Sequence, residues 1–580
     1  MQMILTNTFV ALAALAGIAL AAPSTVGTLV HGPRVIPNTF QKLGFAAGVT
    51  PFTMTFHLNG ANLDGLAAAM DQNAATLGNP FTMEQIASYA SPSTADQNAV
   101  QSYLTSQGFT ASQMTYSAFK DEVTVTTTVA KAASILGTTF HDYSFAGQTM
   151  PRALNYTIPS AISNSVFHVS PVTSFVNVKA SPIKKKITPA KKRELWAQED
   201  ALETRATRAV PAGCSTGGVT PTCLRNLYQT SSYTPVAGAN TDVFVAGFIG
   251  QYVSQSDLTS FLKTYRPAAA GYKIPIINVK GAVNLGIDPG VEAMLDVETV
   301  VSATYPLKST FYNYGNQLSQ GDIFGAAFND IINNYAKYGK PGVYSISYGA
   351  DENSVTQTEA TAMCNSAMKL SAMGTTIVLS SGDNGVGGSS GDTCPPFVPT
   401  YPSGCPYILS VGATQNFSPE VAVDPSLAGF YSGAGFSNLF ARPAYQNTAV
   451  TNYLNSIGTL DAGYYTKGGR GYPDISAQGS LYIITVMGQS ELVSGTSCSA
   501  PTTSSVIALL NSARRQKGQG NVGYINPFFY SHNTTLTDVT SGSSKGCGNT
   551  TYGFPAKNGW DPSTGLGTPL FPNIRAAYGV

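Results

Sequence analysis

The sequence predicts an α/β protein, in which a parallel sheet flanked by helices follows a smaller domain of mixed strands and helices. After Val210, strand-like apolar runs alternate with helical periods, as the strand–helix–strand units of a parallel sheet require. A basic segment over residues 180–209 separates this part from the preceding residues. With 580 residues, the chain is also long enough for more than one domain.

Residues 1–22 are expected to form a secretory signal peptide. The apolar run from Phe9 closes on small residues at Ala21 and Ala22. No Lys or Arg precedes that run, so a short buried helix remains an alternative. No later run has the roughly 20 apolar residues of a membrane span. We therefore expect a secreted, extracellular and monomeric protein, and Asn-x-Ser/Thr triplets at Asn155, Asn416, Asn533 and Asn549 are compatible with that route.

Residues 23–179 are expected to form a propeptide domain, with a strand over 121–129 and a helix over 129–136. Residues 180–209 form a linker that is basic and has little to bury. A plain solvated tether explains these charges. An exposed segment with dibasic pairs would also suit proteolytic processing, which would release the propeptide.

Residues 210–580 are expected to form the larger domain. Apolar runs predict strands over 243–249, 342–347 and 375–380, with helices near 255–265 and 355–373 between them. In such sheets, functional residues gather at the carboxyl ends of the strands. Charged residues make up 11% of the chain against about 25% in typical proteins, and the net charge is +1. Nucleic acid is therefore not an expected partner.

Ser497 is the candidate nucleophile. It lies between a predicted strand over 482–487 and a predicted helix over 502–515, with Pro501 in the first helical turn. Free N–H groups at a helix N-terminus favour the negative charge that develops when a serine is acylated. An ordinary capped helix start would explain the same residues.

The candidate base is a carboxylate, because four of the five histidines precede the linker. The fifth, His532, lies beside the Asn533 triplet, so a conventional triad is hard to build, although it remains possible. Glu292 and Asp296 are four residues apart, on one face of a predicted helix. Two close carboxyl groups share a proton, so Glu292 can act as base with Asp296 orienting it. Two solvated acids are the alternative.

Three further aspartates are candidates for the site. Asp383 follows the strand over 375–380 and could stabilise an oxyanion from its protonated form, or simply form a turn. Asp538 and Asp561 bracket a Gly- and Ser-rich loop that could supply oxygen ligands to a calcium ion. Aspartates in such loops more often make turns.

The seven cysteines allow up to three disulfides and one free thiol. Spacing predicts a bridge between Cys214 and Cys223. We expect Cys498 to be unpaired, because a bridge there would tether the segment that carries Ser497. The remaining pairs cannot be read from spacing.

Several motifs occur in one order along the chain and together resemble the sedolisin family of serine-carboxyl peptidases, which includes acid endopeptidases and tripeptidyl peptidases. The resemblance covers essentially the whole chain, since residues 152–159 look like part of that family's propeptide. The motifs are the Glu292–Asp296 pair, Ser345–Gly349, Ser380–Asp383, Val411–Thr414, Gly471–Ala477 and Ser494–Ser497.

The resemblance implies a subtilisin-like catalytic domain behind an α+β propeptide domain of ferredoxin-like type. It implies Ser497 as nucleophile, Glu292 as base, Asp296 as its partner and Asp383 at the oxyanion. It also implies disulfides Cys364–Cys405 and Cys394–Cys547. One structural calcium would be held by the side chains of Asp538 and Asp561 and by the carbonyls of Val539, Lys557 and Gly559.

The predicted function is that of a secreted, acid-active peptidase made as a zymogen, with peptides or denatured proteins as substrates and its own propeptide as inhibitor and folding aid. Whether it releases tripeptides or cuts within chains stays open. The alternative is a catalytically inactive secreted binding protein on the same fold.

Overall fold

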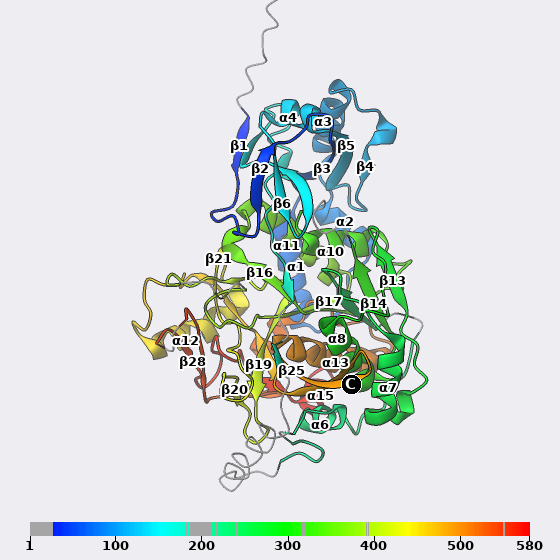
Figure 1. The fold of residues 1–580 in the computed structure, drawn as a ribbon, viewed down its shortest axis with the longest axis vertical. Coiled ribbons are helices and arrows are strands. Elements are labelled where there is room, and N and C mark those ends of the chain that lie inside the picture. Colours follow the sequence, from blue (N-terminus) through cyan, green and yellow to red (C-terminus); the bar gives the residue numbers. More distant parts are fainter. Residues whose placement is uncertain are drawn as a thin grey trace, which may run out of the picture.

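The computed structural model describes residues 27–180, 183–185, 210–215, 217–238, 240, 242–315, 321–389, 391, 394–548 and 551–580. The predicted signal peptide and most of the predicted linker lie outside these residues. A smaller N-terminal domain packs against a larger domain, which contains the rest of the described chain (Figure 1). None of the described helices is both long and apolar enough to cross a membrane.

The N-terminal domain is built on a four-stranded antiparallel sheet of order β4–β5–β3–β9. Helices separate β3 from β4 and β5 from β9, which gives the ferredoxin-like chain order that was expected. The predicted strand and helix over 121–136 are present. The bounds are β3 Pro51–Leu58, α3 Thr94–Ser106, β4 Thr115–Tyr116, β5 Glu122–Thr128, α4 Val129–Leu136 and β9 Val166–Ser170.

Two helices of the N-terminal domain belong to the core of the larger one. On α1 (Leu63–Ala75) and α2 (Met83–Ala90), Leu66, Met70 and Ile86 are buried in a cluster formed mainly by the larger domain. Figure 1 shows these helices beside α10 and α11. Smaller strands complete the domain: β1 Thr28–His31, β2 Gln41–Phe45, β6 His141–Phe145, β7 Gln148–Arg152 and β8 Asn155–Ile158.

The larger domain contains the predicted parallel sheet. Its order is β13–β14–β12–β15–β17–β19, with β23 parallel to β19 and β20 antiparallel at the edge. The bounds are β12 Val243–Gly247, β13 Ile276–Val279, β14 Ser309–Tyr314, β15 Val343–Ile346, β17 Thr376–Ser380, β19 Leu409–Gln415, β20 Val421–Ala422 and β23 Ile475–Gln478.

Helices cover both faces of this sheet, because alternate residues of each strand point to opposite sides. Val243 and Val245 join one buried cluster, whereas Phe244 and Ala246 join the other. The first cluster includes α7 (Gln255–Tyr265), α8 (Val291–Thr304) and α13 (Thr496–Gln516); the second includes α10 (Ile323–Asn333) and α11 (Gln357–Ala372).

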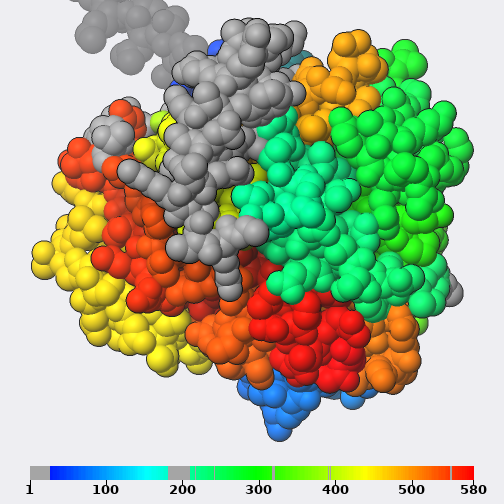
Figure 2. All heavy atoms as spheres, turned by 90° about the horizontal axis from the view of Figure 1, so that it is seen from below, coloured from blue at the N-terminus to red at the C-terminus, as the bar shows by residue number. Residues whose placement is uncertain are grey.

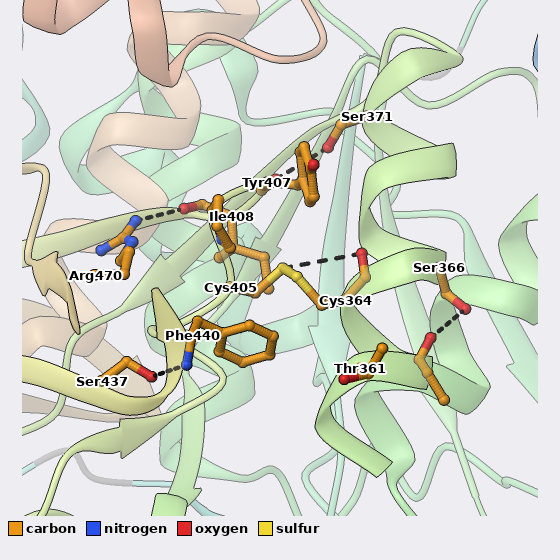
Figure 3. Close-up of a disulfide and its surroundings, with 12 residues drawn as sticks. Thr361, Cys364, Ser366, Ser371, Cys405, Tyr407, Ile408, Ser437, Phe440 and Arg470 are labelled. Atoms are coloured by element: carbon orange, nitrogen blue, oxygen red, sulfur yellow. Dashed lines mark hydrogen bonds between the residues drawn. A yellow bond between two sulfur atoms is a disulfide. The ribbon is translucent and has the colours of Figure 1, made fainter. Parts of the chain in front are cut away.

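The three expected disulfides are present: Cys214–Cys223, Cys364–Cys405 and Cys394–Cys547. Cys498 is free and buried, as predicted. The Cys364–Cys405 bridge joins α11 to the loop before β19 (Figure 3). It therefore fixes a helix on one face of the sheet to the start of a central strand.

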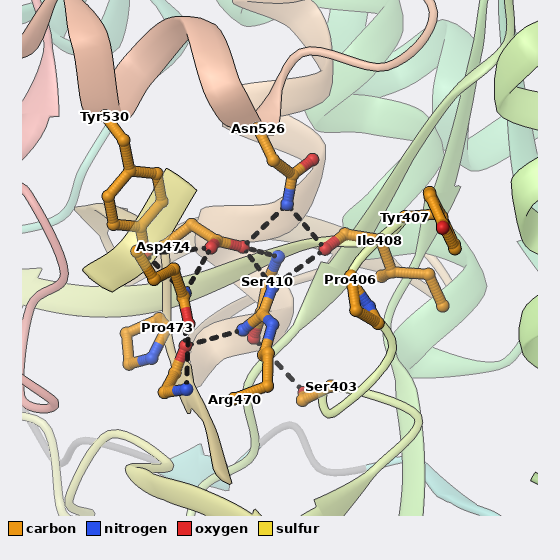
Figure 4. Close-up of polar contacts among 12 residues, drawn as sticks. Ser403, Pro406, Tyr407, Ile408, Ser410, Arg470, Pro473, Asp474, Asn526 and Tyr530 are labelled. Atoms are coloured by element: carbon orange, nitrogen blue, oxygen red, sulfur yellow. Dashed lines mark hydrogen bonds and ion pairs between the residues drawn. The ribbon is translucent and has the colours of Figure 1, made fainter. Parts of the chain in front are cut away.

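A buried ion pair explains the Gly471–Ala477 motif in structural terms. Arg470 and Asp474 are both fully buried and lie 2.5 Å apart, between Arg470 Nη2 and Asp474 Oδ2 (Figure 4). Asp474 also accepts hydrogen bonds from the Ser410 backbone N–H and the Tyr530 hydroxyl, and Arg470 donates to the Ile408 carbonyl. The pair thus ties the start of β19 to helix α14 (Asn526–Ser531).

The C-terminal residues close the face of the larger domain that Figure 2 shows, where residues from about 210 to 238 adjoin the C-terminal helix α15 (Phe571–Ala577). The ring of Tyr233 packs on Phe571, with centroids 5.5 Å apart. Remaining elements include α6 Pro221–Leu227, β16 Tyr348–Asp351, β18 Thr400–Tyr401, β21 Gly435–Ala441, α12 Asn447–Ile457, β22 Gly469–Tyr472, β26 Leu536–Thr537, β27 Ser543–Lys545, β28 Gly553–Pro555 and β29 Thr568–Pro569.

Candidate active site

Ser497 is presented by a hairpin that runs into a helix. Strands β24 (Tyr482–Val486) and β25 (Gln489–Ser494) pair antiparallel, and the turn residues Met487 and Gly488 have φ values of 51° and 72°. Positive φ at both positions is the turn that suits a two-residue hairpin. Strand β25 was not predicted. It ends three residues before Ser497, which is 1% exposed in the first turn of α13.

The position of Pro501 differs from the prediction. Helix α13 begins at Thr496 and not at Thr502, so Pro501 lies inside the helix. Because proline has no N–H, the carbonyl of Ser497, four residues earlier, lacks its usual helical donor. Ser497 itself still lies at the helix N-terminus, where N–H groups have no partner within the helix.

The Ser497 hydroxyl donates to Glu292 Oε2 at 3.2 Å. Glu292 lies in the first turn of α8, which has no side-chain cap from Gly290. Instead, Gln251 Oε1 accepts the backbone N–H of Glu292 at 3.1 Å. A Cβ on Gly290 would come within 2.0 Å of that oxygen, so the close approach needs glycine here.

Glu292 and Asp296 are buried, with exposures of 1% and 0%, so they are not the solvated acids of the alternative. Burial, and then the nearby Asp296 charge, raises the pKa of Glu292 well above its usual range, and burial raises the pKa of Asp296 likewise. Asp296 Oδ1 accepts a hydrogen bond from the Ser347 hydroxyl at 2.9 Å. The arrangement favours a pair that holds one proton.

Asp383 lies next to the nucleophile segment. Its Oδ1 accepts from both the backbone N–H and the hydroxyl of Thr496, at 2.8 and 2.7 Å, and Thr496 Oγ1 accepts from the Gly382 N–H at 3.1 Å. Burial raises the pKa of Asp383 to about 7, although these hydrogen bonds lower it. Among the described residues, none bonds to Asp383 Oδ2. In acid this carboxyl group is neutral and can donate.

The structure does not bring His532 to this site. The residue ends helix α14, its ring stacks on Phe528 with centroids 4.7 Å apart, and Nδ1 contacts the Ser531 hydroxyl at 2.9 Å. A triad that uses His532 therefore has no support in the geometry.

The two aspartates of the predicted calcium loop both accept hydrogen bonds from the backbone of residues 557–559. Gly559 N–H donates to Asp538 Oδ2 at 2.7 Å, and Lys557 N–H donates to Asp561 Oδ2 at 2.9 Å. Asp561 is fully buried, and burial raises its pKa to about 8. The described residues include no cluster of three or more His, Cys, Asp or Glu side chains that could hold a metal. Any ion here would therefore depend on main-chain oxygens.

Three residues that contact the site had no assigned role at the sequence level. Ser347 and Thr496 belong to quoted motifs, but their hydroxyl partners depend on how β15, β17, α8 and α13 meet. Gln251 had no signal in its own segment, because it caps a helix that starts 40 residues later in the chain. The cue available in the sequence is the absence of a capping side chain at Gly290.

Two protein-family models match parts of the chain. Residues 38–175 match "Pro-kumamolisin, activation domain", and residues 307–535 match "Subtilase family". The chain is 34% identical over 462 residues to the probable tripeptidyl-peptidase SED3 of Trichophyton verrucosum, covering 74% of each chain. It is 30% identical over 603 residues to the probable tripeptidyl-peptidase SED2 of Arthroderma benhamiae, covering 97% of this chain and 98% of the relative. Among solved structures, Pseudomonas sedolisin, a serine-carboxyl proteinase, aligns over 62% of this chain and 97% of its own, with 22% identity and a TM-score of 0.48.

Proposed function

The chain belongs to the sedolisin family and is a serine-type peptidase with an activation domain; from this premise we propose that Ser497, Glu292, Asp296 and Asp383 carry out acid peptide hydrolysis. The observation that carries the proposal is the 3.2 Å hydrogen bond from Ser497 Oγ to Glu292 Oε2, in a site without histidine among the described residues. A carboxylate that accepts the serine proton replaces the usual imidazole.

In the first half-reaction, Ser497 Oγ attacks the peptide carbonyl carbon while Glu292 takes the hydroxyl proton. The carbonyl oxygen becomes negative, and protonated Asp383 donates a hydrogen bond to it. Collapse of this intermediate breaks the C–N bond, and Glu292 returns its proton to the leaving amine. The product is an acyl ester on Ser497.

In the second half-reaction, Glu292 removes a proton from water, and the water oxygen attacks the carbonyl carbon of the ester. The C–O bond to Ser497 then breaks, Glu292 returns the proton to Ser497 Oγ, and the acid product is released. Burial, and then the Asp296 charge, raises the pKa of Glu292, so Glu292 is a stronger base for the serine or water proton. Asp296 acts through Glu292 by holding the one proton of the pair while Glu292 is ionised. Asp383 must hold its proton in both halves. Since its pKa is raised to about 7, the proposal predicts an enzyme that works in acid.

The substrates are peptides or denatured proteins. The relatives at 34% and 30% identity are named tripeptidyl-peptidases, which supports the release of tripeptides from free N-termini as the first activity to test. Cleavage within chains is the second, and both use the same acyl-enzyme.

The domain boundaries are a signal peptide over 1–22, a propeptide over 23–179, a linker over 180–209 and a catalytic domain over 210–580. The activation-domain match over 38–175 lies within the proposed propeptide and supports that segment. Where the propeptide ends, β10 (Lys179–Ala180) pairs with β16, which begins next to Ser347. Strand β11 (Ile183–Lys185) pairs with β25, which ends three residues before Ser497. A chain in that position would block substrate, which supports an intramolecular inhibitor that is removed on maturation.

The protein is proposed to be secreted and extracellular. The apolar N-terminal run, three disulfides and exposed acceptor residues Asn155 and Asn533 support an oxidising, secretory route. Cleavage in the linker would then follow export. A monomer is proposed.

A structural calcium is proposed in the C-terminal loop. The donor set fits a hard cation: carboxylates of Asp538 and Asp561, and the carbonyls of Val539, Lys557 and Gly559. Burial raises the pKa of the Asp561 carboxyl to about 8. A bound cation would lower that pKa, so the carboxyl group would be ionised when the ion is present. The ion would stabilise the loop and has no role in the chemical steps.

The function is tested by incubating the secreted protein with N-terminally free and blocked peptides from acid to neutral pH and identifying products by mass spectrometry. Cleavage confined to acid, and absent in Ser497→Ala, is the expected result. Activity that peaks at or above neutral pH would contradict the proposed role of Asp383.

A further inference from the structure

The acceptor residue Asn533 lies at the wall of a pocket in the larger domain. Asn533 and Thr534 are exposed in η5 (Asn533–Thr535), a single 3₁₀ turn after α14, and Thr535 completes an Asn-x-Thr triplet. The pocket that Asn533 lines has a volume of about 570 Å³. Pockets of roughly 300 to 1,000 Å³ are typical of sites for small molecules. A group attached to Asn533 Nδ2 therefore starts at the wall of a space that can hold it.

The pocket lies mainly between segments of the larger domain. Helices α12 and α14 and the loop over 558–560 form its walls, and α1 of the N-terminal domain closes one side with Asp71 and Ala75. Asp71 is the one charged side chain among the described residues that line it. The walls that belong to the larger domain therefore offer no opposite charge to an ionic ligand, and they favour a neutral one.

Three aromatic side chains, Tyr445, Tyr530 and Trp560, line this pocket. The Tyr530 hydroxyl donates to Asp474 Oδ1 at 3.1 Å (Figure 4), and Trp560 Nε1 donates to the Pro473 carbonyl at 2.9 Å. The hydroxyl of Tyr445 likewise donates to a main-chain carbonyl, at 3.0 Å. Because these polar atoms are bonded within the protein, the three residues offer apolar ring surface to the pocket.

Polar side chains surround this aromatic surface. Thr448 and Asn452 of α12 and Asn558 of the loop are exposed and line the pocket. They supply one hydroxyl and two amide groups, which both donate and accept hydrogen bonds. A sugar ring has matching parts, since its C–H groups are apolar and its hydroxyl and acetamido groups are neutral and polar. The lining therefore suits a carbohydrate.

We propose that this pocket holds the first sugars of an N-linked glycan carried by Asn533. The inference rests on the proposed secretory route, because the glycan is added there. Asn533 Nδ2 forms a bond to the anomeric carbon of an oligosaccharide carried on a lipid diphosphate; the C–O bond to the diphosphate breaks, and the amide gives up one proton. The covalent link then keeps the sugars close to the pocket, so weak contacts are enough to hold them there.

The test uses the full secreted chain with Ser497→Ala, so that the protein does not cleave itself. Mass spectrometry of its glycopeptides shows whether Asn533 is modified. A peptide N-glycosidase, which cleaves the bond between asparagine and the first sugar, is then applied to the native and the unfolded protein. We expect release from native Asn533 to be at least about tenfold slower than after unfolding, because the sugars must first leave the pocket.

A pair of variants separates the pocket from the acceptor. Thr448→Phe fills the pocket and leaves Asn533 unchanged, so native release should become about tenfold faster. Asn447→Phe is the matched control, since Asn447 is exposed, neighbours Thr448 on α12 and does not line the pocket. Its release rate should equal that of the parent protein.

Hydrogen exchange gives a second measurement that does not depend on Thr448→Phe. Removal of the glycan in Asn533→Gln should raise exchange over residues 444–452 and 558–560. Asn155→Gln removes another exposed acceptor, on β8, and should leave exchange in both segments unchanged.

The outcomes distinguish the pocket from the secretory route. Equal release rates in Thr448→Phe and Asn447→Phe, together with unchanged exchange in Asn533→Gln, would overturn the inference. An exported chain with a glycan on Asn155 and none on Asn533 would overturn it as well, but would leave the secretory route intact. A chain that is not exported and keeps residues 1–22 would contradict the route itself, and the inference with it.

Discussion

The pH dependence of activity is expected to follow the protonation of the Asp383 carboxyl group. Burial raises the pKa of its carboxyl to about 7, so the group is neutral and can donate below that pH, and it is ionised above it. An ionised Asp383 would repel the oxyanion that it is proposed to stabilise. Activity should therefore fall as pH rises through about 7.

Replacing Asp383 by Asn keeps a hydrogen-bond donor for the oxyanion but removes the carboxyl group that ionises. The amide donates at every pH, so we expect Asp383→Asn to keep activity within about tenfold in acid and to lose the decline near pH 7. Asp383→Ala has no donor and should lose about 10² to 10³ in kcat in acid, where the unmodified carboxyl group donates. The measurement is kcat/KM against pH for the three proteins. A decline near 7 that persists in Asp383→Asn would assign it to another group.

Ser347 is a positioning residue for the carboxyl pair. Its hydrogen bond lowers the pKa of Asp296 against the effect of burial. In Ser347→Ala the pKa of Asp296 should rise further. The pair would then ionise at higher pH, so the acidic limb of the kcat profile should move to higher pH. We expect kcat at low pH to fall about tenfold, which corresponds to a pKa shift of about one unit. Ser347→Thr keeps the hydroxyl and should restore the profile, and an unchanged acidic limb in Ser347→Ala would contradict the role.

For individual residues, the sequence predicted the catalytic groups but not their hydrogen-bond partners. Glu292 and Asp296 could be paired because helical spacing brings residues four apart together. The partners of those residues could not be predicted, since Ser347 and Thr496 meet the carboxyl groups only when α8, α13 and the sheet pack.

Among the elements, the join between β19 and α14 depends on the buried Arg470–Asp474 pair. Removing one partner leaves an unpaired buried charge, so Asp474→Ala should lower the free energy of unfolding by about 3 to 5 kcal/mol. Urea denaturation measures this loss. The double change Arg470→Met with Asp474→Leu removes both charges and should cost less than Asp474→Ala alone. An equal or larger loss in the double variant would show that packing, and not the unpaired charge, dominates.

Elements with strong periodicity were predicted closely, and those set by turns were not. The predicted helix near 255–265 is α7, and the predicted strand over 375–380 is β17. Strand β25 was missed because its hairpin turns at Met487-Gly488, which lacks the usual Asn-Gly or Asp-Gly signal. The start of α13 was predicted six residues late, because Pro501 was read as a first-turn residue.

For the whole molecule, the fold class and the Cys214–Cys223 bridge follow from sequence patterns, and the other two disulfides follow from the family resemblance. The fit of the propeptide on the larger domain follows from neither. Leu66 and Ile86 lie on helices of the N-terminal domain, yet they are buried in a cluster formed mainly by the larger domain. Lys369 of α11 forms a buried ion pair with Asp121 of the propeptide. Such contacts between distant segments have no local pattern, so a sequence alone does not reveal them.

The proposed calcium gives a prediction at the same scale. A chelator should lower the Tm of the protein and added calcium should restore it, because an ion that binds only the folded state stabilises it by mass action. Asp561→Asn should have a lower Tm that neither treatment changes. Lys557→Ala is the matched control, since only its carbonyl is proposed as a ligand, and it should behave as the unmodified protein. A Tm that is insensitive to the chelator would contradict the calcium site.

Covalent trapping can show whether Ser497 is acylated with Glu292 as its base. The protein without its propeptide is treated at acid pH with a fluorophosphonate probe, and the modified peptide is identified by mass spectrometry. We predict an adduct on Ser497 that is lost in Glu292→Gln but kept in Glu298→Gln, a change at another buried glutamate of α8. An adduct that forms equally well in Glu292→Gln, or only above neutral pH, would contradict this mechanism.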